Sequence, residues 1–597
     1  MPVNPFNPMV VQSDHTVLLE VDNPSYADAR DALARFAELE KSPEHIHTYR
    51  LSPLSLWNAA ASGLGADAIV DLLIRYSKYD VPGNIQADVR DYVSRFGRIK
   101  LRKGETGDLL LTADDALVMV EVSRQRKVRQ FILEEIDPHT VRVNPAMRGH
   151  VKKALVDIGY PAEDLAGYVD GAPLPLALLP AMRRTAQPFG LRRYQQEAVD
   201  IFHAQGSARG GSGAIVLPCG AGKTVVGIGV MGQLQTNTLI LTTNTVAVRQ
   251  WIDELHDKTT LERDMIGEYT GDSKEIRPVT ITTYQILTYR ERRKKGSALE
   301  EFWNDDFDVG DQEEGPLAPA VFPHFGVFQQ RDWGLIIYDE VHLLPAPVFR
   351  MTAELQARRR LGLTATLVRE DGKEDHVFAL IGPKKFDVPW KDLERQGWIA
   401  TAHCHEIRLD MSQERRLLYA LADNREQFVI AATDPAKLAV VEQIITKHPN
   451  DQVLVIGTYL EQLSQLAEQL NAPLLTGKTP VRERQKLYQQ MREGTLRCLV
   501  VSKVANFAID LPDVSVAIEV SGTFGSRQEE AQRLGRILRP KQDGRPAHFY
   551  AIVMRDTKDQ LFGAKRQMFL TEQGYKYEIL YRDDLAPYRP EEDHAAW

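Results

Sequence analysis

The residues best suited to chemistry form a glycine-containing turn between an apolar strand, expected at 213–217, and a helix. The turn comprises Leu217, Pro218, Cys219, Gly220, Ala221, Gly222, Lys223 and Thr224. Glycines let backbone N–H groups curl around an anion at a helix N-terminus, where the helix dipole favours negative charge. We expect a nucleotide phosphate site, with Lys223 pairing with the β- and γ-phosphates and Thr224 holding Mg²⁺. Because Leu217 stands where the usual pattern has glycine, an ordinary strand-to-helix turn is the alternative.

A nucleotide site also needs a carboxylate for the metal and a base for water. Asp339 and Glu340 follow the apolar strand expected at 335–338. We predict that Asp339 contacts Mg²⁺ and that Glu340 orients and deprotonates the attacking water. Without the preceding phosphate turn, such a pair would be an ordinary surface turn.

A row of arginines near the C-terminus could supply positive charge to the same reaction. Arg533, Arg536 and Arg539 recur at a spacing of three, which places them on one face of a helix. Guanidinium groups suit the charge that develops on a transferring phosphoryl group. We favour Arg536 and Arg539 as catalytic and Arg533 as ATP-binding; a solvated helix face is the alternative.

The elements around these motifs predict an α/β protein built from two similar halves. Short apolar strands alternate with helices, a pattern typical of a doubly wound parallel sheet. The first series is expected at 213–217, 238–242, 279–283, 335–338 and 360–363, and the second at 452–456, 497–502, 514–520 and 548–553. An active cleft between the halves is possible on this pattern.

The first 180 residues are expected to form an accessory region of small α+β units. Three helices and a hairpin at about 50–113 favour a winged-helix-like unit. Such units bind DNA or pack against protein, and the pattern favours the two roles about equally. An α/β unit is expected at about 114–170, and a Pro-rich linker at 171–180. The two α/β halves then span 181–400 and 436–597, the latter with a C-terminal tail.

Composition excludes several classes of protein. There are 73 basic and 82 acidic residues, giving a net charge of -9, so any nucleic-acid site must be a local groove. Three separated cysteines argue against a disulfide framework and favour a reducing compartment, and no apolar segment predicts a membrane span, so we expect a cytoplasmic protein. The run His403-Cys404-His405-Glu406 points alternately to two faces and does not predict zinc. The charged stretch 290–332 is expected to be a surface insertion.

As an ordered set, these motifs resemble superfamily 2 helicases, and within them the XPB helicase family, over about residues 188–555. The resemblance rests on the phosphate turn, Asp339-Glu340-Val341-His342, Leu363-Thr364-Ala365-Thr366, Leu380-Ile381-Gly382-Pro383-Lys384, Ser502-Lys503-Val504 and Gln532 to Arg539. It implies two RecA-like motor domains that use ATP and Mg²⁺ to move 3′ to 5′ on DNA in nucleotide excision repair. It also implies a damage-recognition-like unit before the motor and a thumb-like insertion at 401–435. A nuclease partner is possible by resemblance only.

The resemblance assigns further site residues. Arg369, Glu370 and Asp371 match a motif associated with unwinding, and Gln195 matches an adenine-sensing glutamine. Asp510 ends a segment that departs from the family's Gly-Asp pattern, and we predict that it binds ATP. From their positions after strands, Thr242, Thr243, Asn244 and Thr283 are expected to contact DNA phosphates. Thr364, Thr366 and Gln532 are expected to couple the two sites. Duplex translocation without strand separation, RNA remodelling and a non-enzymatic ATP-bound scaffold are the alternatives.

Overall fold

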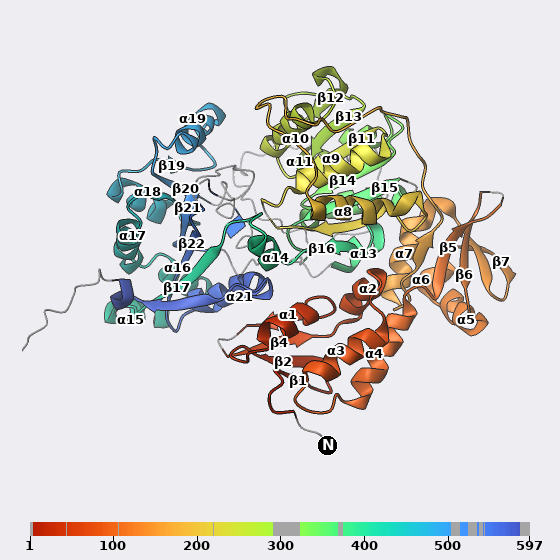
Figure 1. Cartoon of the computed structure of the whole chain (residues 1–597), viewed down its shortest axis with the longest axis horizontal. Helices are drawn as coiled ribbons and strands as arrows, with labels where there is room; N and C mark the ends of the chain where they lie inside the picture. Colours follow the sequence, from red (N-terminus) through yellow and green to blue (C-terminus); the bar gives the residue numbers. More distant parts are fainter. Residues whose placement is uncertain are drawn as a thin grey trace, which may run out of the picture.

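The computed structural model describes four β-sheets with their helices (Figure 1). The described residues are 4–42, 45–105, 107–218, 220–289, 323–356, 358–367, 374–502, 514–522, 534–535, 541 and 544–585. None of the helices within these ranges is long and apolar enough to cross a membrane.

The first motor half is a seven-stranded sheet in the order β12-β13-β11-β14-β15-β10-β16, with every neighbouring pair parallel. Its strands are β10 Ser212–Val216, β11 Thr238–Thr242, β12 Ile266–Tyr269, β13 Val279–Thr283, β14 Leu335–Asp339, β15 Arg359–Thr364 and β16 Lys384–Asp387. Its helices are α8 Arg193–His203, α9 Lys223–Leu234, α10 Thr245–Lys258, α11 Tyr284–Thr288, α12 Ala346–Glu354, α13 Glu374–Leu380 and α14 Trp390–Arg395.

Both faces of this sheet are buried, as continuous apolar strands predict. Ile336 belongs to one hydrophobic core and its neighbour Ile337 to another. Because successive side chains of a strand point to opposite faces, the two cores lie on opposite sides of the sheet. The strands expected from the first apolar series are all present, whereas β12 and β16 had no clear sequence signal.

The second motor half is also a parallel seven-stranded sheet, in the order β19-β20-β18-β21-β22-β17-β23. Its strands are β17 Ala402–Leu409, β18 Gln452–Gly457, β19 Leu474–Leu475, β20 Cys498–Ser502, β21 Val514–Glu519, β22 Ala547–Met554 and β23 Tyr577–Tyr581. Its helices are α15 Gln413–Leu421, α16 Asn424–Ala432, α17 Ala436–Lys447, α18 Leu460–Gln469, α19 Val481–Arg492 and α21 Lys558–Glu572. The expected thumb-like range 401–435 therefore begins with β17, a strand of this sheet, and continues through α15 and α16, of which α16 packs on the sheet core through Ala431.

Strand β17 carries the run that resembled a metal cluster. Cys404 packs into the core shared by both motor halves, whereas His405 stacks on Tyr550 with ring centroids 4.6 Å apart. His403 and His405 both stack against His548 of β22, at 5.3 and 5.8 Å. The alternation expected for a strand therefore separates the cysteine from the histidines, which form an aromatic cluster.

The N-terminal part contains two units. The first is an antiparallel sheet, β1-β2-β4-β3, with four helices: β1 Met9–Val11, β2 Thr16–Glu20, β3 Glu38–Lys41, β4 Ile46–Arg50, α1 Tyr26–Leu33, α2 Pro53–Ala61, α3 Ala66–Tyr76 and α4 Gly83–Arg95. The second is a mixed sheet, β7-β8-β6-β5-β9: β5 Ile99–Lys103, β6 Leu109–Ala113, β7 Ile132–Asp137, β8 Thr140–Val143, β9 Glu163–Leu165, α5 Ala116–Arg124, α6 Arg126–Arg129 and α7 Arg148–Asp157.

The winged-helix-like grouping at 50–113 differs from this arrangement. Its three helices and its hairpin all form, but α2, α3 and α4 pack in the core of the first sheet, while the hairpin β5-β6 pairs with β8 and β9 in the second. Local pattern predicts a hairpin correctly, but it does not show which sheet the hairpin extends, because that depends on strands distant in sequence.

A buried charge cluster joins the second N-terminal unit to the first motor half. Asp164 accepts bonds from the Arg148 guanidinium at 2.6 and 3.0 Å and lies 3.2 Å from the Lys152 ammonium. Lys152 also donates to Gln356 of the motor at 2.9 Å. Burial opposes ionisation of Asp164, but the attraction of Lys152 and Arg148 is larger and lowers its pKa.

The expected linker at 171–180 packs along the first motor half. Leu174 and Leu176 are buried in its core, and the Leu174 and Leu179 amides donate to the Gln235 and Lys258 carbonyls at 2.8 and 2.9 Å. Proline limits regular structure in this segment, while its leucines still supply apolar side chains to the core.

Candidate active site

The expected phosphate turn lies between β10 and α9. Gly220 and Gly222 have φ of +83° and +82°, left-handed values that glycine adopts at little cost. Lys223 and Thr224 open α9, so backbone N–H groups and the helix N-terminus face the same turn. The turn therefore has the backbone shape of an anion-binding loop; Cys219 lies outside the described residues.

Gln195 lies behind this loop. Its side chain is buried; Nε2 donates to the Ala221 carbonyl at 2.9 Å, and Oε1 accepts from the Arg192 amide at 2.9 Å. Both ends of the amide are thus engaged by the protein. We expected Gln195 to bond the adenine base; in this structure it supports the loop backbone.

Asp339 and Glu340 end β14, at the same edge of the sheet as the phosphate loop. The Lys223 ammonium lies 3.4 Å from Glu340 Oε1, so the structure brings together the lysine of one motif and the carboxylate of the other. Glu340 adopts a left-handed backbone conformation with φ of +52°. A residue other than glycine held in this region carries strain, and such strain concentrates at functional sites.

The two carboxylates differ in their ionisation. Burial and the neighbouring Glu340 charge raise the pKa of Asp339 to about 6, although the hydrogen bond from Trp251 acts in the opposite direction and lowers this pKa. Burial also opposes ionisation of Glu340, but the attraction of Lys223 and His342 prevails and its pKa is lowered. Glu340 is therefore the stronger acid and carries negative charge at neutral pH.

Trp251 is a site residue that motif reasoning missed. Its indole Nε1 on α10 donates to Asp339 Oδ2 at 2.8 Å and fixes the orientation of that carboxylate. A Cβ on Gly227 of α9 would lie 2.6 Å from the Trp251 ring, so the glycine admits the indole beside the loop helix. The glycines at 227 and 229 inside a helical pattern were the available signal of close packing.

Thr364 connects the carboxylate motif to the next strand end. Its hydroxyl is 2.7 Å from His342 Nδ1, accepts from the Thr366 amide at 3.1 Å and donates to the Thr366 carbonyl at 2.5 Å. Thr364 and Thr366 are both buried. The expected coupling pair therefore lies in one hydrogen-bonded chain that begins at His342, two residues from Glu340.

The expected DNA-contact residues do lie at strand ends, but their side chains differ in availability. Thr242 is fully buried and donates to the Thr282 carbonyl at 3.2 Å, so its hydroxyl cannot reach DNA in this conformation. Asn244 and Thr283 accept from backbone amides as the N-caps of α10 and α11. Thr243 is half-buried, and its hydroxyl accepts from Asn244 at 3.3 Å.

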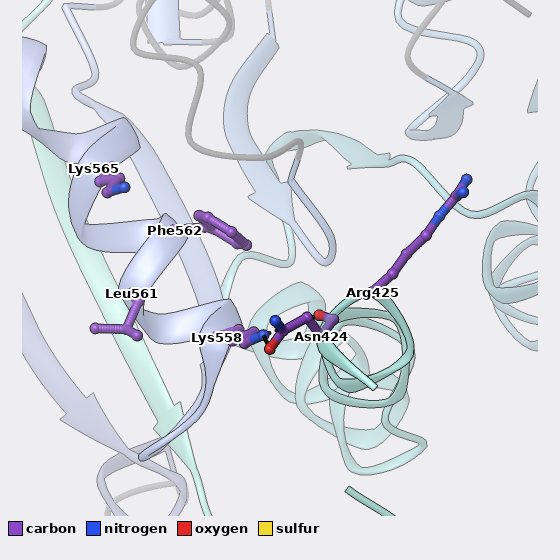
Figure 2. Close-up of a pocket in the computed structure, with 6 residues that line it drawn as sticks. All are labelled: Asn424, Arg425, Lys558, Leu561, Phe562 and Lys565. Carbon is purple, nitrogen blue, oxygen red and sulfur yellow. Dashed lines mark hydrogen bonds between the residues drawn. The ribbon is translucent and has the colours of Figure 1, made fainter. Parts of the chain in front are cut away.

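The range expected to be thumb-like includes Arg415, Arg416 and Arg425, and the first two bond to the protein itself. Arg415 donates to the Ile430 carbonyl, and Arg416 to the carbonyls of Arg555 and Asp556. Arg425 lines a shallow pocket, whose other residues are Asn424, Lys558, Leu561, Phe562 and Lys565 (Figure 2). This pocket lies between α16 and α21, and three of its residues, Arg425, Lys558 and Lys565, are basic.

Several predicted site residues lie outside the described residues. They are Arg369, Glu370, Asp371, Asp510, Gln532, Arg533, Arg536 and Arg539. Most of the charged insertion at 290–332 lies outside them as well.

Two parallel sheets joined by one short connection, with a phosphate loop and an Asp-Glu pair on the first, define a helicase-type motor with RecA-like domains. Three family models match the chain. One described as type III restriction enzyme, res subunit, matches residues 188–369, and ERCC3/RAD25/XPB C-terminal helicase matches 393–593. A third, described as helicase conserved C-terminal domain, matches residues 9–137, in the N-terminal part.

Curated relatives extend over nearly the whole chain. A DNA 3′-5′ helicase XPB of Kineococcus radiotolerans is 52% identical over 98% of this chain and 98% of its own, and one of Mycobacterium tuberculosis is 53% identical over 97% and 98%. The general transcription and DNA repair factor IIH helicase/translocase subunit XPB/SSL2 of Saccharomyces cerevisiae is 30% identical over 95% of this chain and 71% of its own. The chain belongs to the XPB helicase family.

Proposed function

We propose that this chain is an ATP-dependent DNA helicase that moves 3′ to 5′ along DNA. The observation that carries the proposal is the Lys223–Glu340 pair, 3.4 Å apart, between a phosphate loop and a strained strand end. Two bacterial relatives, each more than half identical over nearly their full length, are named DNA 3′-5′ helicases.

In the proposed mechanism, Lys223 changes partner. Phosphates entering the loop compete with Glu340 for the Lys223 ammonium, because a phosphate carries more negative charge than a carboxylate. The Glu340 carboxylate is then free to accept a proton from the attacking water. Arg536 and Arg539, from the second motor half, are proposed to stabilise the charge that develops on the γ-phosphoryl group.

Thr224 and Asp339 are proposed to hold Mg²⁺. Their hydroxyl and carboxylate oxygens are the donors that this ion prefers, and it usually binds through one or two carboxylates together with phosphates. The raised pKa of Asp339 is consistent with such a site, since a nearby cation would favour its charged form. When bound, Mg²⁺ would neutralise phosphate charge.

DNA is proposed to bind at the strand ends through Thr243, Asn244 and Thr283, with backbone donors beside them. Such contacts reach phosphates, so binding should be independent of sequence and should weaken as salt rises. Arg369, Glu370 and Asp371 are proposed to act in unwinding, and Gln532 with Thr364 and Thr366 in coupling to ATP.

A role in nucleotide excision repair, with a nuclease as partner, is proposed from the family. Movement on duplex DNA without strand separation is the second candidate, because the yeast relative is named a helicase/translocase subunit.

Strand displacement separates these candidates. Duplexes with a single-stranded tail at either the 3′ or the 5′ end would be incubated with the protein, ATP and Mg²⁺. We expect displacement only from the 3′ tail. Displacement of a triplex-forming strand without duplex opening would favour translocation, and preferential opening of RNA would overturn the DNA assignment.

A further inference from the structure

The connection between the motor halves is a packed structure. It runs from α14 through residues 396–401 into β17. Trp390, Leu393 and Ile399 are buried in a hydrophobic core that includes strands of both sheets. A relative movement of the two halves would therefore change the packing of this segment.

One end of the connection contacts the support of the phosphate loop. The Arg192 guanidinium stacks over the Trp398 ring at 4.4 Å, and both side chains are half-buried. Arg192 also donates to the Tyr194 hydroxyl at 3.2 Å, and that hydroxyl donates to the Ala221 carbonyl in the loop at 2.6 Å. Three consecutive contacts thus lead from the loop backbone to the connection.

The other end of the connection contacts the second motor half. Trp390 meets Tyr575 edge to face, with centroids 6.2 Å apart, and its amide donates to Gln573 Oε1 at 3.4 Å. The Lys391 ammonium lies 4.2 Å from the centre of the Tyr575 ring. Tyr575 is buried and stands between α21 and β23 of the second sheet.

We propose that Arg192 and Trp398 are positioning residues that couple the state of the phosphate loop to the orientation of the second motor half. A shift of the Ala221 carbonyl would move Tyr194 and Arg192, and stacking of a planar guanidinium on an indole passes a change of orientation to Trp398. The inference rests on the proposed function, because it concerns the response of ATP hydrolysis to DNA.

The test uses the full chain and measures ATP hydrolysis with and without forked DNA. The variants are Trp398→Ala, Trp398→Phe, Arg192→Ala and the double alanine variant. Arg75→Ala is the matched control, because Arg75 stacks on Tyr76 at 5.4 Å, on α3, away from this route. Thermal unfolding of each variant checks that it folds.

We expect Trp398→Ala to lower the DNA-stimulated kcat about three- to thirtyfold, the range for loss of a cation–π contact, with KM for ATP changing less than about twofold. Trp398→Phe should retain most of the stimulation, since a ring remains to stack on. The double variant should be no worse than the more affected single variant.

Three results would overturn the inference. Stimulation of Trp398→Ala equal to that of the native chain and of Arg75→Ala would show that the stack carries no coupling. Additive losses in the double variant would show that the two residues act separately. A raised KM with unchanged kcat would show that the pair holds the nucleotide instead. If the native chain itself showed no stimulation by DNA, that result would contradict the proposed function. It is distinguishable from failure of this inference, in which the native chain is stimulated and Trp398→Ala is stimulated equally.

Discussion

Replacing Gly222 by alanine tests how the phosphate loop is supported. The residue has φ of +82°, a conformation that costs an alanine about 1 to 2 kcal/mol. The new Cβ would lie 2.6 Å from Gln195 Nε2, so the amide must move. Its two buried hydrogen bonds, to Ala221 and from Arg192, contribute about 1 kcal/mol each. The combined cost is about 3 to 4 kcal/mol. The free loop can relax to relieve this cost, whereas nucleotide binding requires the native loop, so binding should weaken by up to about 10²- to 10³-fold.

Titration with a fluorescent ATP analogue measures this change. The controls are Gln195→Ala and the double variant Gly222→Ala, Gln195→Ala, because both lack the two Gln195 hydrogen bonds and only the double variant carries the backbone strain. We expect the double variant to bind about as weakly as Gly222→Ala, so that the losses of the two single variants do not add. Native affinity in Gly222→Ala, or additive losses in the double variant, would refute the assignment of Gln195 as the support of the loop.

Three further predictions concern buried or half-buried polar groups. Thr364→Val removes the hydroxyl beside His342 and should lower DNA stimulation of ATP hydrolysis about tenfold, for a loss of about 1 to 2 kcal/mol; unchanged stimulation would exclude the link. Asp164→Asn leaves the buried Arg148 without its counter-ion and should lower the free energy of unfolding, measured by urea denaturation, by about 3 to 5 kcal/mol. An unchanged denaturation midpoint would contradict a stabilising role for the buried charge cluster. His548, whose pKa burial and nearby histidines lower to about 4, resists protonation when folded. Stability should therefore fall from pH 6.5 towards 4, and His548→Phe should flatten this fall in melting temperature; an equal slope would show that other groups cause it.

The sheet strands and the position of the site could be predicted because they follow from local pattern. β11 and β13 match the expected strands at both ends, since short apolar strands alternating with helices specify a parallel sheet. Parallel strands end at one edge of the sheet, so the phosphate loop and Asp339 were expected to meet there. The Lys223–Glu340 contact agrees with that expectation.

Contacts between distant segments could not be predicted in the same way. Trp251 reaches Asp339 only because Gly227 admits the indole, and the stack of Arg192 on Trp398 joins residues more than 200 positions apart. The hairpin β5-β6 likewise joins β8 and β9, although its neighbours α2 to α4 belong to another unit. Pattern gives the elements, whereas these contacts depend on which surfaces pack together.

The most direct test of the proposed motor is ATP hydrolysis by the native chain and by Glu340→Gln, without nucleic acid and with single-stranded DNA, forked DNA and RNA. Glu197→Gln, on the exposed face of α8, is the matched control. We predict that DNA stimulates hydrolysis by the native chain and by Glu197→Gln, and that stimulation disappears in Glu340→Gln while nucleotide binding persists. Equal DNA-stimulated rates for the native chain and Glu340→Gln would contradict the assignment of Glu340 as the base that activates water.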